Sequence, residues 1–76
     1  MNVRYSAAGE DDWRRLKLED AVSVARAVQS WAATGSGVVY AAGAGEFRLF
    51  VGDRLVVVFL IDDTTDTMHV VQVRRA

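Results

Sequence analysis

Three arginines in the second half of the chain, Arg48, Arg54 and Arg74, have side chains suited to binding a phosphate group. A guanidinium stays charged at physiological pH, can bind two phosphate oxygens at once and stabilises charge that develops on a transferring phosphoryl group. If the three side chains converge, they form a site for a phosphodiester. The alternative is that each arginine lies on an exposed strand and pairs with a neighbouring Asp or Glu across the sheet.

His69 is the only histidine, and it is the side chain best suited to general acid–base catalysis near neutral pH. The sequence shows no Asp or Glu at a spacing that would mark it as a catalytic partner of His69. The simpler interpretation is that His69 lies at a sheet edge or an interface and transfers no proton. Asp62, Asp63 and Asp66 are close enough to suggest a cation site, but the stretch lacks the Gly and the distal Glu of an EF-hand loop. We interpret it as an acidic turn, and we expect no metal and no other cofactor.

Three β-patterned runs in the second half of the chain must position these side chains. Residues 46–51 place Phe47, Leu49 and Val51 on one face and Arg48 and Phe50 on the other. Residues 54–61 are apolar on both faces, with Leu55, Val57, Phe59 and Ile61 on one and Val56, Val58 and Leu60 on the other. Residues 68–74 are the third run. A strand that is apolar on both sides is typical of a central strand with both faces covered. For the last run, the predicted faces are Met68, Val70 and Gln72 against His69, Val71 and Val73.

The first half of the chain predicts a short strand at residues 2–6 and a helical segment within residues 11–34. Asp11 and Asp12 are suited to the N-cap, and Gly35 is suited to the residue that ends the helix. An apolar stripe with helical spacing runs through the segment, but polar side chains interrupt it. The segment is therefore either one bent helix or a short helical hairpin.

These elements predict one α+β domain over residues 1–76, with the order β-α-β-β-β and an antiparallel sheet packed against the helical segment. Residues 38–41 are a candidate for one more short strand. A single helical layer covers only one face of a sheet, so the second apolar face needs a cover. We expect a protein partner, which is either a second copy of the chain or a different protein. The side chains of this predicted interface are Phe50, Val56, Val58 and Leu60.

The charge balance argues mildly against a nucleic-acid-binding protein, because 9 Lys and Arg face 10 Asp and Glu for a net charge of -1. A local basic face is compatible with a neutral total. The sequence opens with no signal-peptide pattern, and its longest apolar run is too short to cross a bilayer. We therefore expect a cytoplasmic protein with no membrane partner.

Several stretches together resemble the RelE/ParE superfamily of bacterial type II toxins. Residues 47–54 (FRLFVGDR) combine an aromatic–Arg–hydrophobic strand with a Gly–Asp turn and a following Arg. Residues 70–75 (VVQVRR) are similar to the superfamily's last strand, which ends in basic residues. The strand at residues 3–6 and the spacing of Trp13 and Leu16 are similar as well. The resemblance covers most of the chain and implies the superfamily's fold.

Members of the RelE branch are ribosome-dependent ribonucleases that cleave mRNA without a metal, whereas members of the ParE branch poison DNA gyrase. An antitoxin that wraps the toxin neutralises both. The resemblance therefore implies a toxin with a cognate antitoxin, which would cover the second apolar face, and with the ribosome and its mRNA as targets. It implies catalytic roles for Arg48, Arg54 and Arg75. We add Arg74 and His69 as residues that bind RNA or phosphate.

Two functions of different classes remain open. The first is a RelE-like endoribonuclease that inhibits translation, and it predicts that the arginines cluster on one surface clear of the helix. The second is a non-catalytic interaction module of the same fold, either a ParE-like gyrase-binding toxin or a degenerate homologue that forms a homodimer. The neutral charge, the lack of a Tyr after Arg75 and a central run that is apolar on both faces favour the second function. The apolar Phe50, where a ribonuclease member keeps a basic residue, argues against catalysis.

Overall fold

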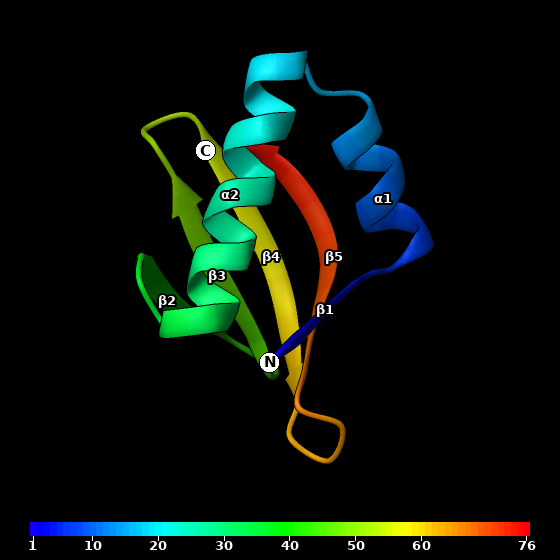
Figure 1. The fold of residues 1–76 in the computed structure, drawn as a ribbon, viewed down its shortest axis with the longest axis vertical. Coiled ribbons are helices and arrows are strands. Elements are labelled where there is room, and N and C mark those ends of the chain that lie inside the picture. The colour runs from blue at the N-terminus through cyan, green and yellow to red at the C-terminus, as the bar shows by residue number, and fades with distance from the viewer.

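Five strands form one sheet in the order β1-β5-β4-β3-β2, and the longer of two helices lies across one of its faces (Figure 1). The computed structural model describes all 76 residues. Along the chain the elements are β1 (Asn2–Tyr5), α1 (Ala7–Arg14), α2 (Leu18–Thr34), β2 (Val38–Gly43), β3 (Glu46–Val51), β4 (Leu55–Asp62) and β5 (Thr67–Arg75).

The predicted α+β class is confirmed, but the sheet is mixed and not purely antiparallel. β1 pairs in parallel with β5, and Val3 lies opposite Met68. Parallel neighbours require a long connection, and here both helices and three strands, β2 to β4, lie between β1 and β5 along the chain. Residues 38–41 lie in β2, which is a full edge strand of the sheet. The order of elements is therefore β-α-α-β-β-β-β and not β-α-β-β-β.

The helical region is a pair of helices, which is the second of the two predicted alternatives. The predicted N-cap role of Asp11 and Asp12 is wrong, because α1 begins earlier. Ser6 is its N-cap, and the Ser6 hydroxyl accepts a hydrogen bond from the Gly9 N–H at 3.0 Å. Gly35 follows α2 in the left-handed conformation with φ 74°, which confirms the predicted helix end.

A bulge in β5 decides which side chains of this strand reach the core. The register against β4 shifts at Val71, the extra residue of the bulge. The predicted alternation is therefore wrong beyond this point: Val73 lies in the core with Val70, and Gln72 lies on the other face. The carboxylate of Asp12 on α1 accepts a hydrogen bond from the Val73 N–H at 3.0 Å. The helix thus satisfies a donor beside the bulge.

The core lies between α2 and the sheet. Its buried members come from one face of α2 and from three strands, at alternate positions except where the bulge shifts β5: Val24, Val28, Leu49, Val51, Leu55, Val57, Phe59, Met68, Val70 and Val73. This list confirms the inward faces predicted for β3 and β4. Trp31 packs on Phe59 with ring centroids 4.7 Å apart, and Trp13 of α1 donates its indole N–H to the Ala21 carbonyl at 3.0 Å.

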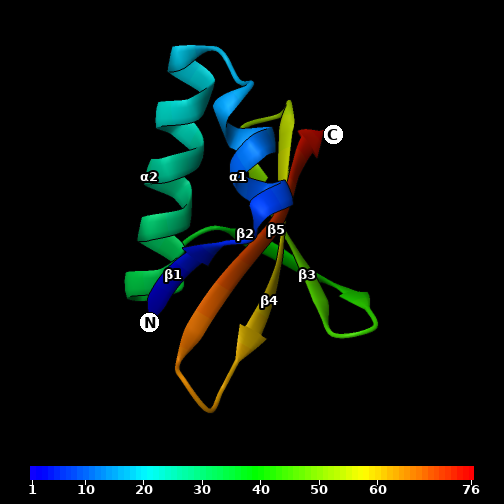
Figure 2. The same cartoon turned by 90° about the vertical axis from the view of Figure 1, so that its right-hand side faces the viewer.

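The opposite face of the sheet carries no helix, as the side view in Figure 2 shows. Neither helix has the length and the apolar composition needed to span a bilayer. Both helices pack on the same face of the sheet, the one that carries the core. The side chains of the strands alone form the surface of the other face, which we call the open face.

Candidate functional site

The open face holds three rows of side chains, because residues directly opposite one another in a sheet point to the same side. Neighbouring rows lie about 7 Å apart along the strands. The first row is Arg4, His69, Leu60 and Glu46; the second is Gln72, Val58, Arg48 and Tyr40; the third is Arg74, Val56, Phe50 and Val38. Three arginines and the only histidine therefore share this face.

Arg48 occupies the middle of the open face, between Tyr40 and Val58 in the register. Its Nε is buried and has no hydrogen-bond partner. The side chain forms no ion pair, and Arg74 on the same face forms none either. A buried donor without an acceptor is costly, so an anion placed against Arg48 would supply a partner that the protein itself does not.

Arg54 and Arg75 do not join this group. Arg54 follows the turn after β3, and its guanidinium contacts the carboxylate of Asp20 on α2 at 2.5 Å. Arg75 lies opposite Leu55, a core residue, so it belongs to the side of the sheet that faces the helices. Of the residues predicted as functional, Arg48, Arg74 and His69 are thus brought to one face, and these two arginines are placed elsewhere.

We expect Arg54→Ala to destabilise the protein, because it would leave the Asp20 carboxylate, which is 8% exposed, without its cation. Arg54 itself is more than half exposed, so the expected loss is about 1–3 kcal/mol and not the larger value of a fully buried pair. Urea unfolding of Arg54→Ala, Asp20→Ala and the double variant measures the coupling. Additive losses in the double variant would show that the contact contributes nothing to stability.

The predicted interface residues lie on the open face, but they differ in exposure. Val56 and Val58 are only 3% exposed, because the neighbouring rows cover them, whereas Leu60 is 36% exposed. Phe50 packs edge-on against Tyr40 with ring centroids 5.5 Å apart. Tyr40 is 60% exposed, so an apolar and aromatic surface extends to the free edge of the sheet at β2.

The sequence patterns did not predict two residues of the open face, Tyr40 and Arg4. Tyr40 lies in the stretch that the sequence predicted only as a short extra strand. Arg4 reaches the face because β1 runs parallel to β5, which places it beside His69. The alternation of residues 2–5 is a signal that sequence reasoning can use for Arg4, since it separates Arg4 from the apolar Val3 and Tyr5.

The acidic stretch after β4 is a turn, as predicted. The Oδ1 atom of Asp62 accepts hydrogen bonds from the Thr64 and Thr65 N–H groups at 3.0 and 3.4 Å. A hydrogen bond from the Thr65 side chain, and more weakly these backbone donors and the nearby His69, hold the pKa of Asp62 below its usual value. Asp62 is therefore a carboxylate at neutral pH and an acceptor at the edge of the open face.

The fold of this chain recurs in known proteins, although its sequence matches no protein-family model and no curated protein. A chain of the intact E. coli RelBE toxin–antitoxin complex superposes with a TM-score of 0.81 at 11% identity, covering 99% of this chain and 95% of that one. For the RelBE2 toxin–antitoxin complex from Mycobacterium tuberculosis the TM-score is 0.76 at 20% identity, with 99% and 96% covered. The YoeB/ParE toxin from Agrobacterium tumefaciens gives 0.77 at 15% identity, with 100% and 99% covered.

The chain therefore has a RelE/ParE-like fold, as the sequence resemblance implied. The match covers 100% of this chain and 99% of the Agrobacterium tumefaciens chain, so the likeness in fold extends over the full length of both.

Proposed function

We propose that this protein is the toxin of a type II toxin–antitoxin system and that it cleaves mRNA on the ribosome. The end-to-end match to a YoeB/ParE toxin and to chains of two RelBE complexes supports the toxin assignment. A cognate antitoxin is then the natural partner, and the exposed Tyr40 and Leu60 with the neighbouring Phe50 offer it an apolar surface.

The main support for the ribonuclease proposal is that Arg48 has no partner for its charge or for its buried N–H donor. It is a cation in the middle of an open face, without a carboxylate partner and with a buried donor that lacks an acceptor. A phosphate of an RNA strand crossing the sheet would provide that acceptor. Cleavage by the ribose 2′-hydroxyl needs a group that stabilises the extra negative charge on the phosphate in the transition state, and a preoriented guanidinium serves that purpose.

The other cations of the face take supporting roles in this proposal. Arg74 lies one row beyond Arg48 and would hold a neighbouring phosphate. His69 lies in the row on the other side and would bind the RNA strand there. Because Arg54 is ion-paired with Asp20 and Arg75 lies on the face of the sheet that carries the helices, we assign neither of them a role in cleavage.

The same placement of Arg54 and Arg75 favours a second candidate function. A non-catalytic module of this fold, whether it binds gyrase or another copy of itself, needs an apolar surface and does not need converging arginines. The aromatic edge formed by Tyr40 and Phe50 fits that need. The two candidates make different predictions for growth and translation.

Induced expression in a bacterial culture tests the proposal, with incorporation of a radiolabelled amino acid into protein followed after induction. We expect growth arrest with a rapid loss of protein synthesis, and we expect Arg48→Ala/Arg74→Ala to relieve both. A loss of about 100-fold or more in cleavage rate is typical when a charge-stabilising donor is removed. Arg26→Ala is the matched control, because Arg26 is an exposed arginine of α2 that forms no ion pair.

The other outcomes separate the candidates. Arrest with protein synthesis initially intact would point to gyrase and away from mRNA. Arrest that the double variant leaves unchanged would exclude Arg48 and Arg74 from the active surface. No arrest with soluble, folded protein present would favour the non-catalytic module.

A further inference from the structure

A polar pocket lies at one corner of the open face, where β1, β5 and the turn between β4 and β5 meet. Its volume is about 680 Å³, within the range of small-molecule sites. All but one of its lining side chains are polar: Asn2, Arg4, Asp62, Thr65, Thr67 and His69. The role proposed above for the central arginines does not account for this pocket.

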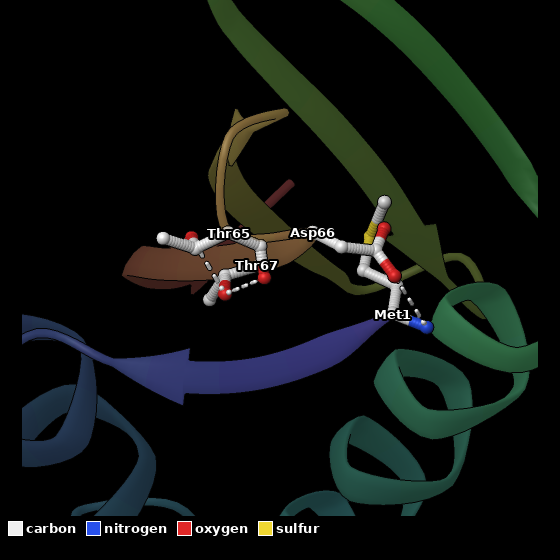
Figure 3. Close-up of polar contacts among 4 residues, drawn as sticks. All are labelled: Met1, Thr65, Asp66 and Thr67. Atoms are coloured by element: carbon white, nitrogen blue, oxygen red, sulfur yellow. Dashed lines mark hydrogen bonds and ion pairs between the residues drawn. The ribbon is translucent and has the colours of Figure 1, made fainter.

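Polar contacts in and beside the pocket wall hold it in place, and Figure 3 shows those among Met1, Thr65, Asp66 and Thr67. Thr67 is almost fully buried and its hydroxyl is hydrogen-bonded to both the hydroxyl and the carbonyl of Thr65, at 2.9 and 3.1 Å. The chain's amino group lies 3.6 Å from the Asp66 carboxylate, and the Asn2 N–H donates to the Asp66 carbonyl at 2.8 Å. These contacts tie β1 to the turn, so the pocket is preformed and costs little ordering when a ligand binds.

The groups that face the pocket have unused hydrogen-bonding capacity. The side chains of Arg4, His69 and Asn2 form no hydrogen bond or ion pair within the protein. Arg4 and His69 are direct neighbours across β1 and β5. One side of the pocket therefore offers a cation and donors, while Asp62 on the other side offers an acceptor.

This combination of charges discriminates between classes of ligand. A bare phosphate or sulfate would gain from Arg4 but would be repelled by the Asp62 carboxylate. A nucleotide satisfies both sides, because its phosphate accepts from a guanidinium while its ribose hydroxyls and base N–H groups donate to a carboxylate.

We propose that this corner pocket binds a nucleotide, with Arg4 on the phosphate and Asp62 on a ribose hydroxyl or a base N–H. The pocket belongs to the face that carries Arg48. The two rows lie about 7 Å apart along the strands, and β1 lies three strand positions, about 14 Å, from β3 across the sheet. Insofar as the nucleotide is part of an RNA strand, the inference rests on the proposed ribonuclease function and adds a subsite for a nucleotide a few positions away from the scissile phosphate. A free nucleotide has the same chemistry.

Nuclear magnetic resonance of the ¹⁵N-labelled full chain tests the pocket directly. The protein is titrated with adenosine 5′-monophosphate, with an unmodified RNA hexanucleotide, whose ribose hydroxyls remain available to Asp62, and with inorganic phosphate. We expect shifts of the amides of Arg4, Thr65, Thr67 and His69, and binding that is at least about tenfold weaker in Arg4→Gln, as the loss of one charge-assisted hydrogen bond implies. Arg26→Gln, which removes an exposed charge from α2, should bind like the wild type.

The arms of the titration distinguish the sources of the ligand. Binding of the hexanucleotide but not of the mononucleotide would support a subsite of an RNA strand, and binding of both would support a general nucleotide site. The inference is overturned if neither produces shifts at the pocket, if Arg4→Gln stays folded and binds equally well, or if inorganic phosphate alone shifts the same amides as strongly. No ribosome or culture is involved, so a failure of the pocket and a failure of the toxin assay are read separately.

Discussion

Phe59→Ala is expected to remove a large share of the protein's free energy of unfolding at room temperature. Phe59 is 0% exposed and lies between Trp31 and Phe47, whose ring centroids are 4.7 and 5.5 Å away. Removing a buried phenyl ring costs about 3–5 kcal/mol, because the cavity that is left collapses only partly. A domain of this size has a total free energy of unfolding of roughly 4–11 kcal/mol, so one side chain accounts for a large share of it.

Urea unfolding followed by tryptophan fluorescence measures this loss, since Trp31 reports on the cavity itself. Leu60→Ala is the matched control, because it shortens the next residue of β4 on the partly exposed face. We expect the control to cost less than about 1.5 kcal/mol, in proportion to the smaller area that it removes from the interior. Equal losses in the two variants would contradict a core confined to the helix side of the sheet.

Gly9→Ala is the second substitution for which we expect a large effect. Gly9 is a buried residue of α1, and a Cβ built on it would lie 2.4 Å from the backbone carbonyl oxygen of Val70. Because the obstacle is backbone at the edge of the β5 bulge, relief requires α1 to move away from the strand. Overpacking of this kind costs about 1–3 kcal/mol or more, and the shift would also strain the hydrogen bond from Val73 to Asp12.

The sign of the change in stability distinguishes a closely packed α1 from an unobstructed one. In an unobstructed helix, replacing glycine by alanine stabilises by about 1 kcal/mol. A raised thermal midpoint for Gly9→Ala would therefore show that α1 does not pack as closely on β5 as the structure places it. Near-ultraviolet circular dichroism should change as well, because Trp13 on α1 packs in the core beside Tyr5.

Local patterns in the sequence determined most of the secondary structure of this protein. The period-2 patterns of β3 and β4 are sufficient to predict their inward faces, because successive side chains of a strand alternate between the faces of a sheet. Gly35 and the Gly52–Asp53 pair mark element ends for an equally local reason, since both glycines adopt positive φ, 74° and 62°. These features depend only on neighbours along the chain.

The composition of the open face could be predicted only in part. The sequence places Arg48 on a strand face opposite the core, and the structure agrees. It predicts His69 and Val73 on one face of the last strand, and the bulge at Val71 separates them. Such a bulge depends on how β5 meets β4 and α1, which no local pattern in the strand reveals.

The side chains that Arg54 and Arg4 lie beside depended on tertiary structure alone. In the sequence, Arg54 resembles Arg48 as an arginine of a β-rich stretch, but α2 brings Asp20 to its guanidinium from 34 residues away. Arg4 lies near the start of the chain, and the crossover that makes β1 parallel to β5 sets it beside His69. The sequence by itself therefore determined which strands and helices form and which faces are apolar, because those properties arise within a few residues. Only the tertiary structure decided which charges meet, because each of those contacts joins segments that the chain connects through a whole helix or sheet.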